Sequence, residues 1–297
     1  MPALVLGLLA ACQTSPSPSG QVASPTLPSV SGAFGSKPTL VFTGGDAPRT
    51  LQSKILQRGV GRAVANGDLL VADYLGQVWR GGVFADSYDG RAPAGMLIGR
   101  GKVLTGWDDA LVGVPVGSRV VMSLPPKKAY GSAGNPRAGV RGNATLVFVV
   151  DVVAAYNGAA RGEATAVPQR LVTPGVVVIG APGGVPQVQV WHGARAPRST
   201  TVSVLARGTG AVVGPGLLVV QYVARRYAGG SAGSTFARGA PAAVTVARPS
   251  SGRPFDQAIG LPLGSRILLE VPARKGHPAI AAVVDLVAQP RGAAASR

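Results

Sequence analysis

The chain has 297 residues, 46% of them hydrophobic, which is typical of about two globular domains. Its net charge is +17, but the Arg residues are scattered and no nucleic-acid-binding motif is present, so nucleic acid is not an expected partner. The charge indicates either attraction to an anionic surface or an Arg-rich exterior without a specific partner. The single cysteine excludes an internal disulfide and a Cys-rich metal site.

An apolar stretch at residues 4–11 directly precedes this cysteine. It is too short to span a membrane, which takes about 20 residues, but it suits the core of a secretory signal. Leu9-Ala10-Ala11-Cys12 resembles a bacterial lipobox, so we expect residues 1–12 to be a lipoprotein signal and Cys12 to be lipidated. The protein would then be extracytoplasmic and anchored to the bacterial cell membrane. The alternative is an ordinary signal peptide with an incidental cysteine. Either kind of signal fits poorly in one respect, because no Lys or Arg precedes the apolar core.

Residues 13–30 form a Ser-, Pro- and Thr-rich tract that follows Cys12. Such a composition cannot bury a core, so we predict a disordered tether. A tether between a lipid anchor and a folded domain would let that domain stand away from the membrane.

The rest of the chain contains an internal repeat. Residues 47–49, 67–74 and 117–119 recur, at a nearly constant offset, as 196–198, 215–222 and 264–266. The repeat predicts that the chain holds two copies of one domain, joined by a linker and followed by a tail. The expected boundaries are 31–156 for the first domain, 157–183 for a Gly-, Ala- and Pro-rich linker, 184–289 for the second domain and 290–297 for a tail.

The first copy is predicted to be mostly strand, with one short helix. Residues 69–74, 116–124 and 144–153 are rich in Val, Leu and aromatic residues, and Gly, Pro and Asn flank them. Residues 107–112 are predicted to be helical, because acidic residues occupy the first turn and Gly113 follows the end. The expected fold class is α+β, with a twisted antiparallel sheet wrapped on a short helix in each copy.

Several short motifs follow one another along the first copy in a characteristic order. They are Gly67-Asp68, Tyr74-Leu75-Gly76, Gly82-Val83-Phe84, Val103-Leu104-Thr105-Gly106-Trp107-Asp108, Leu124-Pro125-Pro126, Ala129-Tyr130-Gly131 and Asn143-Ala144-Thr145-Leu146-Val147-Phe148. No single motif is specific, but their order and spacing resemble the FKBP-type peptidyl-prolyl isomerases over nearly a whole domain. The resemblance extends to a bacterial lipoprotein form with tandem domains.

The resemblance implies an apolar aromatic pocket that needs no cofactor. Catalytic roles would fall to Tyr74, Phe84, Asp86, Trp107, Tyr130 and Phe148, with Trp107 as the floor and the Tyr130 hydroxyl bonded to a substrate carbonyl. Val103, Leu104 and Val140 would bind substrate, the Leu104 amide as a donor and Val140 from an overhanging loop. Phe84 and Phe148 fit a purely structural core role equally well. The implied partners are proline-containing unfolded or secreted polypeptides, and the resemblance also implies macrolides as ligands.

Two positions depart from the family pattern. The family has an Asp directly after the pocket Phe, whereas this chain has Ala85 there and Asp86 one residue later. A local bulge would be needed for Asp86 to restore the carboxylate. A second pocket aromatic, expected after Pro93, is replaced by Ala94. Both changes are expected to lower activity or alter specificity.

The second copy departs further and is expected to fold without catalysing. Tyr222 and Phe236 match Tyr74 and Phe84, while Phe255 takes the place of Trp107. The Ala-Tyr-Gly loop is missing, and Ala282 stands where the first copy has Phe148. Neither His192 nor His277 has metal-ligand spacing around it, so no metal is expected. Two functions remain open: an isomerase of extracytoplasmic polypeptides, or a catalytically weak or inactive chaperone or binding protein of the same fold.

Overall fold

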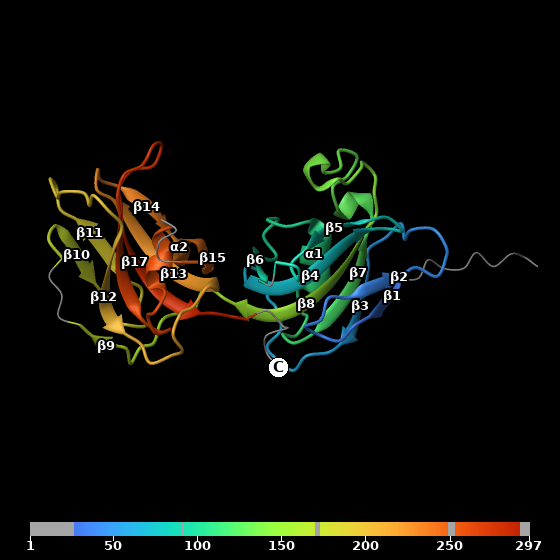
Figure 1. Ribbon diagram of the computed structural model, residues 1–297, viewed down its shortest axis with the longest axis horizontal. Coiled ribbons are helices and arrows are strands. Elements are labelled where there is room, and N and C mark those ends of the chain that lie inside the picture. Colours follow the sequence, from blue (N-terminus) through green and yellow to red (C-terminus); the bar gives the residue numbers. More distant parts are fainter. Residues whose placement is uncertain (1–26, 91, 170–172, 249–252, 292–297) are drawn as a thin grey trace, which may run out of the picture.

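A computed structural model describes residues 27–90, 92–169, 173–248 and 253–291. The predicted signal peptide, Cys12 and most of the predicted tether lie outside these residues. In the described part, the strands form two large antiparallel sheets that lie next to each other along the long axis (Figure 1). No helix among these residues is both long enough and apolar enough to cross a membrane.

The first sheet has the strand order β3-β7-β8-β4-β5, and β6 pairs with the first half of β4. The central strands β4 and β8 are rich in Val and Leu, which suits strands that have neighbours on both edges. Helical turns connect the strands. The elements are β3 (Gln52–Gln57), β4 (Leu69–Val78), β5 (Val83–Asp86), β6 (Ala94–Leu97), α1 (Thr105–Leu111), β7 (Arg119–Leu124), η1 (Pro126–Lys128), η2 (Pro136–Ala138) and β8 (Leu146–Tyr156).

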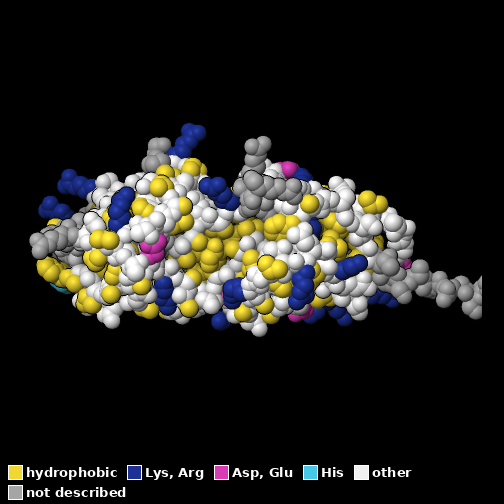
Figure 2. All heavy atoms as spheres, turned by 90° about the horizontal axis from the view of Figure 1, so that it is seen from below, with side chains coloured by type: hydrophobic (Ala, Val, Ile, Leu, Met, Phe, Trp, Pro, Cys, Tyr) yellow, Lys and Arg dark blue, Asp and Glu magenta, His cyan; other side chains and the backbone are white. Residues whose placement is uncertain are grey.

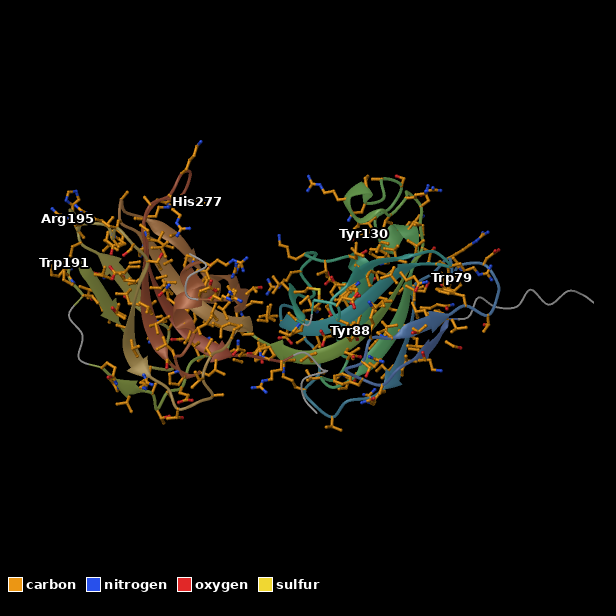
Figure 3. The ribbon with its side chains drawn as sticks, viewed as in Figure 1. Trp79, Tyr88, Tyr130, Trp191, Arg195 and His277 are labelled. Atoms are coloured by element: carbon orange, nitrogen blue, oxygen red, sulfur yellow. The ribbon has the colours of Figure 1, made fainter. Side chains whose placement is uncertain are left out.

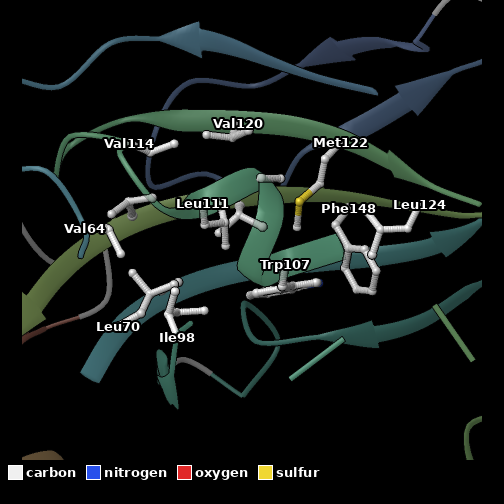
Figure 4. Packing of buried hydrophobic residues seen from close by; sticks show 14 of the residues in the cluster. Val64, Leu70, Ile98, Trp107, Leu111, Val114, Val120, Met122, Leu124 and Phe148 are labelled. Carbon is white, nitrogen blue, oxygen red and sulfur yellow. The ribbon is translucent and has the colours of Figure 1, made fainter. Parts of the chain in front are cut away.

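The helix α1 packs against one face of this sheet (Figure 4). Trp107 and Leu111 point into the core, where they meet residues of β4, β7 and β8 such as Met122. The helix begins after Leu104 and is followed by Gly113, whose φ of 86° is a left-handed value that glycine adopts without strain. The predictions of an antiparallel sheet and of a helix in this segment are therefore confirmed.

The second sheet has the order β14-β13-β17-β16-β12-β9, and β15 pairs with β13. Its strands follow the same order as those of the first sheet: β12, β16, β17, β13, β14 and β15 stand where β3, β7, β8, β4, β5 and β6 stand. A short 3-10 helix, η4, takes the place of α1. The elements are β9 (Val167–Pro168), β12 (Thr201–Arg207), β13 (Gly216–Arg226), β14 (Ser231–Ser234), α2 (Thr235–Arg238), β15 (Ala242–Val246), η4 (Pro254–Ala258), β16 (Arg266–Val271) and β17 (Ile280–Ala288).

Each sheet contains one buried ion pair at the same position in its ladder. Arg119 lies opposite Asp151 on β7 and β8, and Arg266 lies opposite Asp285 on β16 and β17. The Nε–Oδ1 distances are 2.6 Å and 2.7 Å, and all four side chains are buried. The remaining guanidinium N–H groups find partners outside the sheet.

Those partners are mainly carbonyl groups of a two-stranded hairpin, which precedes β3 in the first sheet and β12 in the second. The hairpins are β1 (Ser29–Ser31) with β2 (Thr39–Val41), and β10 (Val176–Ile179) with β11 (Gln187–Val190). Arg119 donates to the carbonyls of Gly32 and Ser36 in the first turn. Arg266 donates in the same way to the turn between β10 and β11. Each buried arginine therefore fastens a hairpin to its sheet.

The hairpins correct the predicted boundaries. The predicted linker, residues 157–183, includes both β9 and β10, and Val176 of β10 packs with Val188 against the second sheet. The boundary at residue 184 would cut the β10–β11 hairpin, and the boundary at residue 31 falls at the end of β1. Of the Gly and Pro residues that indicated a linker, Gly180, Pro182 and Gly183 lie in the turn that Arg266 holds.

The two sheets touch through a small apolar cluster. Leu69 and Val71 of β4 are buried together with Leu217 and Val219 of β13. Gly95 of β6 lies very close to β15, because a Cβ atom at Gly95 would come within 2.3 Å of the Cβ atom of Ala243.

Lys and Arg side chains are spread over the face seen in Figure 2 and do not gather in one patch.

Candidate functional site

An apolar hollow of about 190 Å³ opens where α1 meets β4 and β5 of the first sheet. Nine residues line it, and most of them are aromatic or aliphatic. They are Tyr74, Phe84, Ala85, Met96, Val103, Leu104, Trp107, Tyr130 and Phe148. The structure therefore brings seven of the predicted site residues together around one opening, which we call the first hollow.

The floor of the first hollow consists of aromatic rings packed edge to face. Trp107 is 4% exposed and Phe148 is 3% exposed, and their ring centroids are 5.2 Å apart at 79°. Tyr74 meets Trp107 at 5.4 Å, and Phe84 meets Phe148 at 5.6 Å, both at 84°. Edge-to-face packing is the favoured arrangement of aromatic pairs, so each ring holds the next in position.

Gly76 of β4 makes room for this floor. A Cβ atom at this position would lie 2.7 Å from an atom of the Phe148 ring and 3.0 Å from an atom of the Phe84 ring. Both distances are shorter than ordinary contacts, so any side chain here would displace the rings. A glycine inside a strand often marks such a close approach, and this signal could have been read from the sequence.

The rim at Val103 and Leu104 is held by the carboxylate of Asp108. Its two oxygens accept hydrogen bonds from the amides of Gly99 and Gly101, at 2.7 Å and 3.0 Å. The loop before α1 is therefore fastened to the first turn of that helix. The Leu104 amide donates to no atom of the described residues, which leaves it available to a ligand.

The hydroxyl groups of Tyr74 and Tyr130 complete the polar part of the rim. Neither makes a hydrogen bond within the described part of the chain. Burial, followed by the proximity of Tyr130 and Asp86, raises the pKa of Tyr74, so its hydroxyl stays neutral. Tyr130 follows η1 in the loop above the sheet (Figure 3), where the Gly131 amide bonds to the Pro126 carbonyl. The hollow thus combines an apolar floor with hydrogen-bond donors at its edge.

Two predicted site residues do not line the first hollow. Val140 is 3% exposed and belongs to the core, and its amide donates to the Asn135 carbonyl. Asp86 instead forms an ion pair with Lys37 at 2.5 Å and accepts a hydrogen bond from the Tyr88 amide at 2.6 Å. Neither is placed where the resemblance implied direct contact with a substrate.

The pairing of β4 and β5 is irregular at Phe84, but this irregularity does not bring Asp86 into the lining, and the Asp86 carboxylate is held by other partners. Burial alone would raise the pKa of Asp86, but the hydrogen bonds from Lys37 and from the Tyr88 and Asp89 amides together lower it. Hydrogen bonds to the carboxylates of Asp86 and then of Asp89 raise the pKa of Lys37. Ala85 is the residue that faces the opening. The carboxylate expected from the family is therefore missing from the lining.

Met96 is a lining residue that the sequence interpretation missed. It lies on β6, two residues after Ala94, and so on the same side of the strand. Its flexible thioether side chain fills irregular apolar space well. Met96 thus supplies part of the apolar surface that an aromatic residue at position 94 would have provided.

Matching hydrogen bonds relate the two sheets residue by residue near the site. The Ser87 hydroxyl accepts a bond from the Tyr74 amide at 2.9 Å. The Thr235 hydroxyl accepts one from the Tyr222 amide at 2.7 Å. Tyr222 therefore matches Tyr74, as predicted, and Thr235 matches Ser87.

These matches correct one prediction for the second copy. Phe236 directly follows Thr235, so it corresponds to Tyr88 and not to Phe84. The strand pairing places Ala232 where the first sheet has Phe84. Phe236 instead packs under the guanidinium of Arg161, 4.6 Å from its ring centroid. Phenylalanine alone was a poor guide because the two segments share few other residues.

Metal chemistry has no obvious place in this site. In the described ranges, no group of three or more His, Cys, Asp or Glu side chains is arranged to hold a metal ion. The first hollow can bind an apolar ring and donate hydrogen bonds to a carbonyl, and its lining contains no carboxylate, thiol or imidazole.

Comparisons with known proteins find similarity over part of this chain. The FKBP-type peptidyl-prolyl cis-trans isomerase family model matches residues 61–153. FK506-binding protein 1 of Debaryomyces hansenii is 40% identical over 108 residues, covering 36% of this chain and 96% of that protein. FK506-binding protein of Streptomyces anulatus is 33% identical over 119 residues, covering 40% and 96%. The crystal structure of FkpA from Escherichia coli is 31% identical, with a TM-score of 0.33, and the match covers 36% of this chain and 48% of that one.

The fold and the matched segment together define a member of a prolyl isomerase class. The chain belongs to the family of FKBP-type peptidyl-prolyl cis-trans isomerases. The matched residues 61–153 run from just before β4 into β8, and they include every residue that lines the first hollow.

Proposed function

We propose that this protein is a prolyl isomerase that turns over X-Pro bonds in the first hollow. The observation that carries the proposal is the aromatic floor, in which Trp107 and Phe148 are almost fully buried and held by edge-to-face contacts. The lining offers an apolar surface for a prolyl ring, with hydrogen-bond donors at its edge. Its substrates would be proline-containing unfolded or secreted polypeptides.

The chemistry of the reaction explains why such a site suffices. Rotation about a peptide bond has a barrier of about 18–20 kcal/mol, because conjugation gives the C–N bond partial double-bond character. The two isomers of an X-Pro bond differ by only about 0.5–1 kcal/mol, so the protein needs only to lower the barrier. The twisted transition state has less charge separation than the planar amide, and an apolar site therefore favours it over the ground state.

We assign roles to the residues that line the opening. The prolyl ring would lie on Trp107, between Tyr74 and Phe148. The substrate carbonyl groups would accept hydrogen bonds from the Tyr130 hydroxyl and the Leu104 amide. Because the curated relatives are named for binding FK506, we place such a macrolide in the same hollow, where it would compete with peptide during turnover.

The variant Ala85→Asp is expected to raise isomerase activity. Ala85 lines the hollow, and a carboxylate at this position would lie near the Tyr74 hydroxyl, which lacks a hydrogen-bond partner among the described residues. One added charge-assisted hydrogen bond, worth about 1.5–3 kcal/mol, corresponds to an increase of about tenfold or more in kcat/KM. A protease-coupled assay on an X-Pro peptide, run on the whole chain with and without the substitution, measures the change.

A matched substitution controls for added charge alone. The control is Ala237→Asp. Ala237 is exposed on the short helix α2, which follows β14, so this variant should leave turnover unchanged. If Ala85→Asp is no faster than the unsubstituted chain, the carboxylate is dispensable. If both chains turn over no faster than the uncatalysed reaction while folded, the isomerase proposal is wrong.

A second candidate function concerns the second sheet, which we propose is a degenerate copy of the same domain. Ala232 and Ala282 supply no rings at the places of Phe84 and Phe148. Only eight residues separate β16 from β17, so the loop that carries Tyr130 has no counterpart. These differences favour a binding or chaperone role for this unit and leave catalysis to the first.

We also propose that Cys12 carries a lipid anchor and that the protein works outside the cytoplasm. The support is the apolar stretch before Cys12 and the Ser- and Pro-rich tract after it. Substituting Cys12→Ser should move the protein from the membrane fraction to the soluble fraction of a bacterial host, because one side chain would hold the lipid. Immunoblots of the two fractions measure this, and retention of the variant on membranes would contradict the anchor.

A further inference from the structure

Two segments of the first domain form the rim of the first hollow. Residues 99–107 supply Val103, Leu104 and Trp107 to the lining, and residues 125–145 supply Tyr130. These two rim segments contain six Lys or Arg residues and no Asp or Glu, whereas the whole chain has 29 basic and 12 acidic residues. The six are Arg100, Lys102, Lys127, Lys128, Arg137 and Arg141. The rim is therefore more strongly basic than the chain as a whole.

The second rim segment stands above the first sheet as the green loop in Figure 1, and backbone hydrogen bonds hold its shape. The Gly134 amide donates to the Tyr130 carbonyl at 3.2 Å, and the Asn143 amide donates to the Gly131 carbonyl at 2.8 Å. Val140 of the same loop is buried in the core. The backbone that carries these cations is thus fastened to the sheet and to the base of the hollow.

The carboxylates nearest to the rim already have partners. Both oxygens of Asp108 accept hydrogen bonds from amides of the loop before α1. Asp109 forms an ion pair with Lys128 at 2.7 Å, and Asp86 forms one with Lys37. None of these carboxylates lines the hollow.

Most of the rim cations have no such partner. Arg100 lies against Gly67, before β4. The other four are exposed and form no ion pair within the described residues, and they are Lys102, Lys127, Arg137 and Arg141. Lys102 directly precedes a lining residue, and Lys127 lies three residues before Tyr130. Each rim segment therefore places an uncompensated positive charge next to the opening.

We propose that the first hollow selects X-Pro bonds that acidic residues flank. This inference rests on the proposed isomerase function and names its substrate class. With the prolyl ring on Trp107, the residues on either side of the proline would lie over the two rim segments, where their carboxylates would meet Lys102 and Lys127. Because Ala85 leaves the lining without a carboxylate, no negative charge inside the hollow opposes such a segment. Complementary charge of this kind favours one partner over another and speeds its encounter.

The test uses the whole chain and two peptides with blocked ends, Gly-Glu-Pro-Glu-Gly and Gly-Gln-Pro-Gln-Gly. Exchange spectroscopy by NMR measures cis–trans interconversion in each, without a protease. The acceleration per mole of chain should be about threefold to tenfold greater for the Glu peptide at low salt, since exposed ion pairs contribute modestly. At about 1 M salt, where the screening length is about 3 Å, the two peptides should be accelerated almost equally. Equal acceleration at low salt would overturn the proposal.

A double variant locates the selectivity. Lys102→Gln with Lys127→Gln should bring the ratio between the two peptides close to one, because it removes one cation from each rim segment. The matched control is Arg195→Gln with Arg198→Gln, both exposed before β12, where Arg195 lies at the far end of the second sheet (Figure 3). The control should keep the full ratio. A ratio that survives in the rim variant, or that is lost in the control, would contradict the assignment.

Failure of the isomerase proposal can be distinguished from failure of this inference. If neither peptide is accelerated, the isomerase proposal is wrong, and broadening of the peptide signals by the chain then decides the inference. Stronger broadening of the Glu peptide, lost in the rim variant, would support a site for acidic proline segments, and equal broadening would overturn it. Equal treatment of both peptides, with sedimentation on phosphatidylserine vesicles that the rim variant loses, would assign the rim to an anionic membrane surface instead.

Discussion

Replacing Trp107 by leucine is expected to lower kcat/KM for an X-Pro peptide by about tenfold to a hundredfold. Trp107 makes edge-to-face contacts with both Tyr74 and Phe148, and each such contact contributes about 0.5–1.5 kcal/mol. Leucine keeps the site apolar but removes the flat floor and frees the two neighbouring rings. The loss should appear in kcat/KM, because the floor is proposed to support the twisted transition state.

The second sheet offers a matched control for this variant. Phe255 stands in η4 at the place of Trp107, because the next residues, Asp256 and Asp108, accept corresponding hydrogen bonds from the loop before them. Phe255→Leu should leave isomerase activity unchanged. A loss in this control as large as in Trp107→Leu would mean that catalysis does not reside in the first hollow.

Asp151→Asn is expected to destabilise the first sheet by about 3–5 kcal/mol, because it leaves the buried Arg119 guanidinium without its counter-charge. Asp151 accepts two hydrogen bonds from Arg119, and it also accepts bonds from the Tyr88 hydroxyl at 3.0 Å and the Gly35 amide at 2.7 Å. Loss of the carboxylate thus affects β7, β8 and the hairpin together. Urea unfolding followed by circular dichroism and Trp fluorescence measures the change.

The same substitution in the second sheet and a paired replacement sharpen this result. Asp285→Asn should cost less than Asp151→Asn, because within the described residues Asp285 accepts hydrogen bonds only from Arg266. Replacing Arg119 by Met together with Asp151 by Leu should recover part of the lost stability, since no unpaired charge remains, but the hairpin would lose its hydrogen bonds to both side chains. A cost below about 1 kcal/mol for Asp151→Asn would show that the ion pair does not hold the hairpin to the sheet.

Much of the first hollow could be predicted because most of its lining residues belong to short motifs whose order along the chain is typical of the family. Trp107 and Tyr130 belong to short motifs in order along the chain, and the structure brings both to one opening. The family match covers the same segment. The antiparallel sheet and its helix follow from apolar runs bounded by Gly and Pro, which local chemistry is sufficient to indicate.

The features that were missed depend on contacts between distant segments. The hairpin before each sheet is held by Arg119 or Arg266 across more than 80 residues of sequence, and no local pattern shows such a contact. The predicted linker was wrong for this reason. Asp86 was predicted to be a site carboxylate, but it forms an ion pair with Lys37, which is distant in sequence and could not be read from the local pattern. The match of Phe236 to Phe84 failed because it relied on residue type, whereas strand register decides the place.

The rate of X-Pro isomerisation by the whole chain, measured against chain concentration, tests the central proposal most directly. We expect a first-order rate constant that rises above the uncatalysed rate in proportion to the concentration of folded chain. The aromatic floor of Trp107 and Phe148 would then be a working site. A rate constant that stays at the uncatalysed value, in a sample whose circular dichroism shows the folded sheets, would contradict it.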